Sequence, residues 1–184
     1  MTYEIKTQLI GDLPKKGYRK GIGNYEGVVA HATAVWGDSD ENQYRYFVKN
    51  WKARSAFAHF FVDHDSITEI ADRKFIAWAA GFTANQRYVH VEICQSKDPA
   101  KFEQAWKRYT WLIAKLLFDK KIPVKDGLTL ISHKYCSDTW KDTTHQDPIE
   151  YLAFHGKTWD DVIKSVSWWY KKMEEEFKDA KSKS

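Results

Sequence analysis

The longest hydrophobic pattern in the chain follows Asp98-Pro99 and has the period of an α-helix. Apolar and aromatic side chains recur at three- and four-residue steps from Phe102 to Leu117. Asp98 suits an N-cap, and proline suits the first helical turn, so the pattern predicts a helix from residue 98 to about residue 120. A second such period, preceded by polar residues that suit a cap, predicts a helix over residues 39–53.

Strand patterns alternate with these helices. Four segments have the apolar or alternating character of strands: Val28–His31, Ala56–Asp63, Val89–Cys94 and Leu128–Ser132. We expect a further segment, Ile67–Ala71, to pair with the second of them through a turn. In the third, the two-residue period places His90, Glu92 and Cys94 on one face and the apolar residues on the other. Strands that alternate with helices predict an α/β fold with a mixed central sheet flanked by helices.

The C-terminal part of the chain predicts one more helix and then a change of character. Thr158 and Asp161 resemble a capping box at a helix start. After Tyr170 the sequence is mostly charged. We therefore expect residues 1–170 to form one domain and residues 171–184 to fray as a charged tail or to begin a linker. Removing Lys172–Ser184 is then expected to leave the melting temperature nearly unchanged.

Composition limits the class of protein. The chain has 184 residues, of which 43% are hydrophobic and 16% aromatic, which is typical of one globular domain. No apolar run reaches the roughly 20 residues that a membrane helix needs. Residues 1–16 lack the apolar core of a secretory signal, so we expect synthesis in a host cytoplasm and action outside only after release. Two cysteines make no disulfide framework, and the net charge of +4 suits a solvated surface or weak attraction to polyanions.

Candidate chemistry lies where predicted strands end. His31 ends the first strand, His133 follows the strand Leu128–Ser132, and Asp147 lies in the loop after it. Two imidazoles and one carboxylate suit zinc with a fourth position left for water. Their spacing alone does not decide the matter, because isolated histidines usually serve ordinary packing or surface roles, and the HExxH and paired CxxC patterns are absent.

A set of short stretches, in order along residues 18–165, resembles the type 2 N-acetylmuramoyl-L-alanine amidases, especially the catalytic domains of phage endolysins, whose fold is shared with peptidoglycan recognition proteins. The stretches are Tyr25–Thr33, Ala58–Asp63, Ile76–Gly81, Asn85 with Val89–Glu92, and Ser132-His133 with His145–Pro148. Each stretch is weak alone, but the ordered set is specific.

The resemblance implies a zinc site and its catalytic residues. By position in the family pattern, the metal ligands are His31, His133 and Asp147. His145, two residues before the third ligand, faces the scissile carbonyl in that pattern, and Glu92 moves the proton of the attacking water. The resemblance therefore implies an enzyme that cuts the N-acetylmuramoyl–L-alanine bond of peptidoglycan.

Several residues have two roles open to them at the level of sequence. Cys136 could replace Asp147 as a ligand or be a free thiol. His59 could line the groove or be structural, and His90 could support the site or be a plain strand residue. For Asn85 we favour a turn role over substrate contact, and for His64 and His155 a place at the surface or in a turn. Ala77–Gly81 lacks a histidine that relatives carry, and Trp36 and Trp140 suit packing or sugar stacking.

We expect bacterial peptidoglycan as the partner, no nucleic acid or membrane, a monomer, and a wall-binding module beyond the charged tail. Two competing functions are a non-catalytic peptidoglycan-binding protein of the same fold and a cytosolic amidase that recycles muropeptides. The ligand trio with Glu92 argues against the first, and the charged tail argues for the lytic enzyme over the second.

Overall fold

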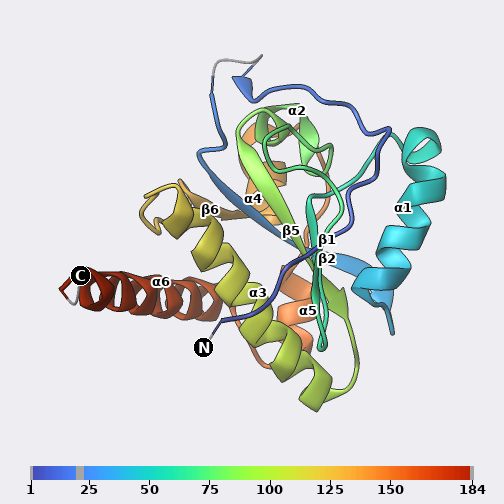
Figure 1. The fold of residues 1–184 in the computed structure, drawn as a ribbon. Helices are drawn as coiled ribbons and strands as arrows, with labels where there is room; N and C mark the ends of the chain where they lie inside the picture. Colours follow the sequence, from blue (N-terminus) through green and yellow to red (C-terminus); the bar gives the residue numbers. More distant parts are fainter. Residues whose placement is uncertain (1, 20–22, 183–184) are drawn as a thin grey trace.

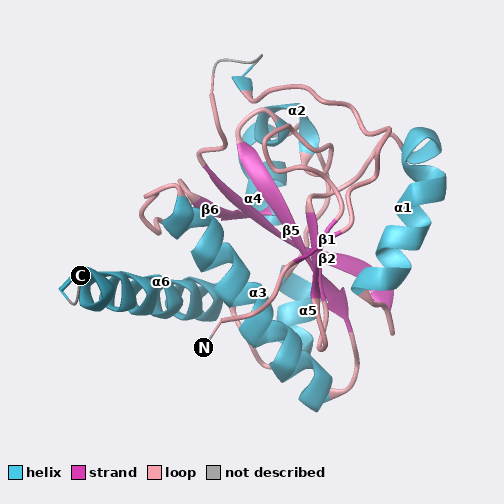
Figure 2. Ribbon diagram, in the orientation of Figure 1, coloured by secondary structure: helices cyan, strands magenta, loops and turns pink. Residues whose placement is uncertain are grey.

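The computed structural model describes residues 2–19 and 23–182, and over these residues six strands form one sheet in the order β1-β4-β3-β5-β2-β6 (Figure 1, Figure 2). β3 and β4 pair antiparallel and the other neighbours pair parallel, which confirms the mixed central sheet. The strands are β1 Lys6–Thr7, β2 Gly27–Trp36, β3 Phe60–Val62, β4 Ile67–Glu69, β5 Tyr88–Gln95 and β6 Leu130–Ser132.

Helices cover both faces of the sheet. They are α1 Asp40–Arg54, α2 Gly81–Asn85, α3 Pro99–Asp119, α4 His133–Trp140, α5 Ile149–Phe154 and α6 Trp159–Ser182. The predicted caps of the long helices are confirmed, since Ser39 accepts from the Asn42 amide and Asp98 from the Ala100 and Lys101 amides. Thr158 and Asp161 also bond to each other at the start of α6.

The sheet has an apolar face and a face that carries the candidate chemistry. On the first face, Val28, Ala30 and Val91 form one core with the buried stripe of α3, and α6 packs on α3. Fully burying an aliphatic side chain of this kind contributes about 1.5–3 kcal/mol. Alternation turns His31 and Glu92 toward the opposite face, where α1, α2 and α4 lie. The sheet therefore separates the α3–α6 layer from the candidate site.

The charged tail is part of a helix. α6 continues without a break to Ser182, so the expectation that the chain frays after Tyr170 is wrong over the described residues. The reason is a stripe at helical spacing that runs past residue 170, in which Met173 packs against the main core and the Phe177 ring lies 6.2 Å from that of Phe118. The predicted boundary at residue 170 falls inside this helix, and the linker stays a prediction.

Short elements differ most from the sequence pattern. The segment Ala56–Asp63, predicted as a strand, forms a regular strand only over Phe60–Val62. All three residues of this strand are buried, so the alternating sequence pattern does not correspond to one buried face and one solvent-exposed face. β2 is longer than predicted and runs to Trp36. Within the described parts of the chain, no helix has the length and apolarity needed to cross a bilayer.

Candidate metal centre and its groove

Sheet register brings the candidate residues together. β2 lies between β5 and β6, and His31 on β2 is directly opposite Glu92 on β5. On the other side Ala30 pairs with Ser132, the last residue of β6, so His133 follows as the first residue of α4. The Ser132 hydroxyl caps this helix by accepting from the Tyr135 amide at 3.0 Å. The loop that follows α4 then brings Asp147 back beside His31 and His133.

The donor atoms of His31, His133 and Asp147 lie within 4.8 Å of one another. The Nδ1 atoms of the two histidines are 3.1 Å apart, and each lies 3.0–3.1 Å from an oxygen of Asp147. Two ligands at 2.0–2.1 Å from a tetrahedral ion are separated by about 3.3 Å. The residues therefore fit a zinc ion in donor type and in spacing, with a fourth position left for a small molecule.

The outer nitrogen of each ligand histidine also has a partner. His31 Nε2 lies 3.1 Å from His90 Nδ1, and His133 Nε2 lies 2.9 Å from the Thr143 hydroxyl. With Nδ1 facing an ion, the ring proton stays on Nε2 and is donated to these acceptors, which fixes the tautomer and the ring orientation. Tyr109 of α3 donates to the backbone oxygen of His31 at 3.0 Å and steadies the strand from the other face.

Electrostatics within the cluster favour a charged Asp147 carboxylate beside a neutral His31 ring. Burial alone raises the pKa of Asp147, but hydrogen bonds from His133 and His31 hold that pKa well below its usual range. Burial lowers the pKa of His31, and the hydrogen bond with Asp147 only partly opposes this effect. A neutral imidazole and an ionised carboxylate are the forms that bind metal.

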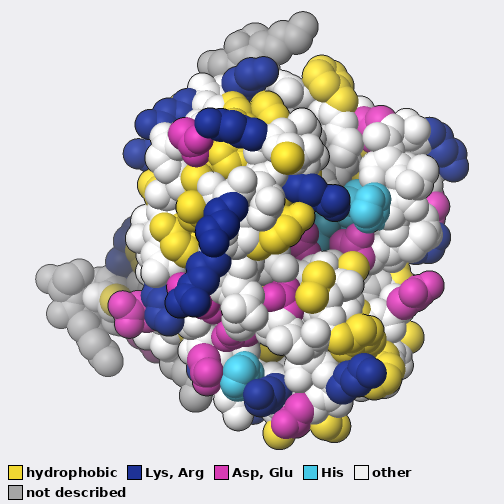
Figure 3. Space-filling view, turned by 90° about the vertical axis from the view of Figure 1, so that its right-hand side faces the viewer, with side chains coloured by type: hydrophobic (Ala, Val, Ile, Leu, Met, Phe, Trp, Pro, Cys, Tyr) yellow, Lys and Arg dark blue, Asp and Glu magenta, His cyan; other side chains and the backbone are white. Residues whose placement is uncertain are grey.

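Glu92 and His145 open onto a groove of about 740 Å³ beside the cluster. The His145 ring stacks on that of His133, with centroids 5.0 Å apart and planes within 8°. Burial raises the pKa of Glu92 well above its usual value, and the charges of Asp147 and Asp38 add to this. On the face that carries α1, Figure 3 shows histidine and acidic side chains side by side in a hollow with basic and hydrophobic neighbours.

His59 and His90 form a buried extension of the site. His59 Nδ1 accepts from the His90 amide at 3.0 Å, and its Nε2 lies 2.8 Å from the Phe75 carbonyl oxygen. The two rings are parallel, with centroids 5.7 Å apart. His59 therefore has the structural role, and it is fully buried rather than exposed to the groove. His90 contacts His31 through its Nδ1, which is the position that a supporting role requires.

Three more residues that the sequence left undecided have structural roles in the fold. Cys136 is buried, its thiol donates to the Ser132 carbonyl, and burial raises its pKa to about 12, so a thiolate ligand is disfavoured. Asn85 has the turn role, since its side-chain oxygen accepts from the Ala79 and Ala80 amides. His155 has the turn role, at the end of α5, where it is half-buried with its ring stacked on that of Phe102.

Trp36 and Trp140 have packing roles, the first of the two roles that the sequence left open. Trp36 is 45% exposed to solvent, and its ring packs against the rings of Tyr151 and Phe154. Trp140 is half-buried against Tyr88 and Tyr135. Neither residue lines the groove beside the metal cluster.

Some groove residues had no signal in the sequence. Thr143 stands in a polar loop like many others, and only the fold shows that it holds His133. Phe82, which is 68% exposed on the groove wall, and Arg54, at the end of α1, also line the groove. An aromatic in a short helix and a basic residue in a last turn are usual features, so no pattern could single them out.

Comparison with known proteins agrees with this geometry. A family model described as N-acetylmuramoyl-L-alanine amidase matches residues 22–150. Protein Ami of Listeria monocytogenes is 33% identical over 94% of this chain and 19% of its own length. The endolysin of a Listeria phage is 32% identical over 84% of this chain and 46% of its own length. The chain thus spans less than half the length of these curated relatives.

A solved structure has the same architecture. The crystal structure of Staphylococcus aureus hydrolase AmiA in complex with its ligand superposes with a TM-score of 0.87 at 28% identity, and the match covers 92% of this chain and 85% of that one. The catalytic domain of XlyA, at 21% identity and a TM-score of 0.69, supports the fold alone.

Proposed function

Because the chain belongs to the N-acetylmuramoyl-L-alanine amidase family, we propose that it hydrolyses the bond between N-acetylmuramic acid and L-alanine in bacterial peptidoglycan with zinc bound by His31, His133 and Asp147. The observation that carries the zinc proposal is the convergence of two imidazole nitrogens and a carboxylate at 3.0–3.1 Å beside an open groove. A protein that only binds peptidoglycan has no need of this cluster.

A zinc ion held there supplies a Lewis acid that polarises a carbonyl and makes water more acidic. The chain's own residues supply the proton transfers and the hydrogen bonds. Glu92 takes a proton from the attacking water and passes it to the departing amine of L-alanine. Burial raises the pKa of Glu92, which suits the second step, because a carboxyl that holds its proton can pass it to the departing amine. His145 donates a hydrogen bond to the developing oxyanion.

The proposed setting is a lytic enzyme of the bacterial wall. Relatives named as a bacterial autolysin and as a phage endolysin match this chain at the same identity of 32%, so one catalytic module serves both kinds of protein. These relatives extend well beyond the matched segment, which supports a wall-binding module elsewhere in the full protein. The enzyme is then made in a cytoplasm and acts on the wall after release.

Mass spectrometry of digested peptidoglycan tests the proposal. New free N-termini of L-alanine identify an amidase, whereas new reducing sugar ends identify a glycosidase. Metal analysis is expected to find about one zinc per chain, and stripping the metal with a chelator should stop the reaction until zinc is restored. A protein that binds peptidoglycan but releases no L-alanine termini with zinc present would support a binding-only function instead.

A further inference from the structure

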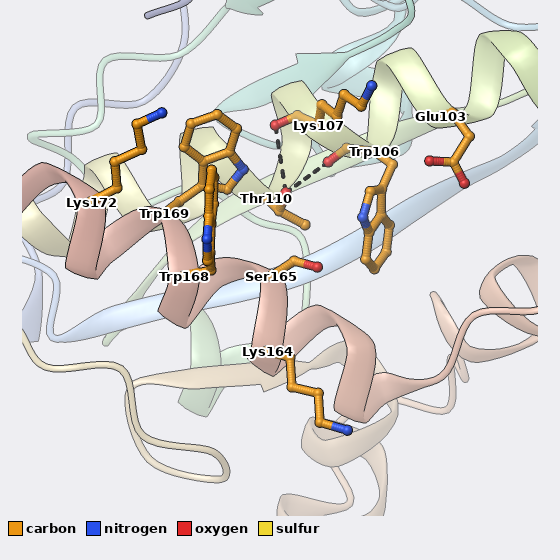
Figure 4. Close-up of a pocket in the computed structure, with 9 residues that line it drawn as sticks. All are labelled: Glu103, Trp106, Lys107, Thr110, Lys164, Ser165, Trp168, Trp169 and Lys172. Carbon is orange, nitrogen blue, oxygen red and sulfur yellow. Dashed lines mark hydrogen bonds between the residues drawn. The ribbon is translucent and has the colours of Figure 1, made fainter. Parts of the chain in front are cut away.

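A second hollow, of about 570 Å³, lies between α3 and α6 (Figure 4). We call it the α3/α6 slot. It is lined by Glu103, Trp106, Lys107, Thr110, Lys164, Ser165, Trp168, Trp169 and Lys172. None of these residues lines the metal groove, and the sheet lies between the two hollows because α3 covers the face opposite His31. The slot is therefore separate from the catalytic site.

The main wall of the slot is an exposed tryptophan. Trp168 keeps 56% of its surface exposed, whereas its neighbour Trp169 keeps 7% and anchors α6 to the core. In Figure 4 the indoles of Trp168 and Trp106 stand on opposite sides of the slot, with Ser165 and Thr110 between them. The Thr110 hydroxyl is buried and donates to the Trp106 carbonyl oxygen, so Ser165 supplies the hydroxyl of the slot. An open indole face beside a hydroxyl group matches a sugar ring, which offers a C–H face for stacking and hydroxyls for hydrogen bonds.

The rim of the slot is basic. Lys107, Lys164 and Lys172 line it against a single acid, Glu103. Glu103 is paired with Lys157 at 3.3 Å and Lys164 with Asp160 at 2.5 Å, which leaves Lys107 and Lys172 as the main source of positive charge. The Lys172 ammonium lies 5.1 Å from the centroid of the Trp168 ring. Positive charge set beside an aromatic platform attracts an anionic partner and gives its sugar ring a surface on which to stack. The slot is thus complementary to a sugar chain that carries negative charge.

The proposed reaction makes such a chain. Hydrolysis breaks the C–N bond of the amide: the water oxygen stays on the lactyl carbon as a carboxylate, and the nitrogen leaves as the ammonium group of L-alanine. Each turnover therefore adds one negative charge to the glycan strand and removes a peptide that would obstruct its sugar faces. We propose that the α3/α6 slot binds the peptide-free glycan strand, the product of the enzyme's own reaction, and so keeps the enzyme on wall that it has already cut. This inference rests on the proposed function.

A binding titration with defined probes tests the slot. The probes are peptide-free oligomers of the wall disaccharide with free lactyl carboxylates, and the same oligomers with those carboxylates amidated. The full chain should bind the free-carboxylate oligomer, and Trp168→Ala should weaken binding by about tenfold, as expected for the loss of one stacking platform. Trp36→Ala is the matched control, since Trp36 is also an exposed tryptophan but lies outside the slot. The amidated oligomer should bind several-fold more weakly.

Activity measurements separate this inference from the proposed function. Trp168→Ala should cleave a short soluble muropeptide with the parental kcat but clear intact wall more slowly. Parental binding by Trp168→Ala, or equal binding of both probes, overturns the slot as a site for an anionic glycan. Concentration-dependent dimerisation that Trp168→Ala abolishes overturns it too, because the slot is then an interface between two copies. If the parent exposes no new N-terminal L-alanine but binds the oligomer through Trp168, the proposed function fails while the glycan site stands.

Discussion

Buried carboxyl oxygens usually find a hydrogen-bond donor, and among the described residues Oε2 of Glu92 has none. The carboxyl lies on the groove wall with His145 and Asp147. A buried oxygen left without a donor is costly unless a ligand or solvent supplies one. This feature is what a proton shuttle requires, because an acceptor already occupied by the protein could not exchange a proton with a substrate.

Glu92→Gln separates proton transfer from metal binding. Glutamine keeps the shape of the side chain but cannot accept the proton, so turnover should fall by about 10²–10⁴ while zinc content stays at the parental level. Turnover on peptidoglycan and metal analysis measure the two quantities. His133→Ala is the contrasting variant and should lose zinc and activity together. A glutamine variant that lyses walls at the parental rate would refute the role of Glu92.

His145→Ala tests the oxyanion donor. The ring stacks on His133 without contributing a donor atom to the cluster, so its loss should leave the metal in place. Removing one such donor costs about 2.7–4 kcal/mol of transition-state stabilisation, a fall of about 10²–10³ in kcat. The prediction is wrong if kcat is unchanged, or if zinc leaves with the side chain.

His90 is expected to set metal affinity without touching the ion. His90→Leu removes the acceptor for His31 Nε2, and losing a partner of this kind typically weakens metal binding by about 10–100-fold. Competition with a chelating dye measures the affinity directly. His90→Asn, whose side-chain oxygen can still accept, should recover part of the loss, whereas His155→Leu, away from the cluster, should have no effect on affinity. Equal affinity in His90→Leu and the parent contradicts the role.

At the scale of elements, the sequence predicted the helices whose caps and apolar stripes lie within their own segment. α1 and α3 are predictable because Ser39 and Asp98 cap them and their stripes are long. α2, α4 and α5 are short helices that owe their stability to packing, and no pattern marked them. The approach of His31 to His133 follows only from a family resemblance, since 102 residues separate them and spacing carries no such information. The bond between His31 and His90 depends on sheet register and is visible only in the fold.

Two truncations test how far α6 is anchored. A chain that ends after Lys178 keeps Met173 and Phe177 and should melt at nearly the parental temperature. A chain that ends after Lys171 loses the contacts of Met173 with the core and of Phe177 with Phe118. That loss should cost about 1–2 kcal/mol and lower the melting temperature by about 2–8 °C. Equal melting of both truncations and the parent would instead favour a tail that contributes little.

At the scale of the whole molecule, buried neutral histidines make the fold sensitive to acid. Burial is the main cause that lowers the pKa of His59 from 6.5 to about 4. Below pH 6.5 the unfolded chain takes up a proton that the folded chain does not accept until near pH 4, so acid favours unfolding. The contribution of the neutral His59 ring to the free energy of unfolding is complete above pH 6.5 and is lost progressively as the pH falls to 4. This contribution is about 3 kcal/mol. His31 and His90, whose pKa values burial also lowers, act in the same direction.

Urea unfolding at pH 7 and pH 5, in the presence of a chelator, measures this effect. The free energy of unfolding should be lower at pH 5, with about 2 kcal/mol of the difference due to His59. His59→Gln has no titrating ring, so its stability should depend less steeply on pH over the same range, whatever its absolute value. A parent protein that is equally stable at both values would show that these rings accept protons in the folded state.

The order of strands in the sheet sets how late in synthesis the metal-binding cluster can form. β2 is finished at Trp36, yet its two neighbours in the sheet end at Gln95 and Ser132, and Asp147 lies beyond both. A ribosome must therefore deliver most of the chain before the cluster can assemble. Fragments from stalled translation or early proteolysis carry His31 without His133 and Asp147, so they cannot form the cluster. If the proposed function holds, the sheet topology makes catalytic activity one of the last properties that the growing chain acquires.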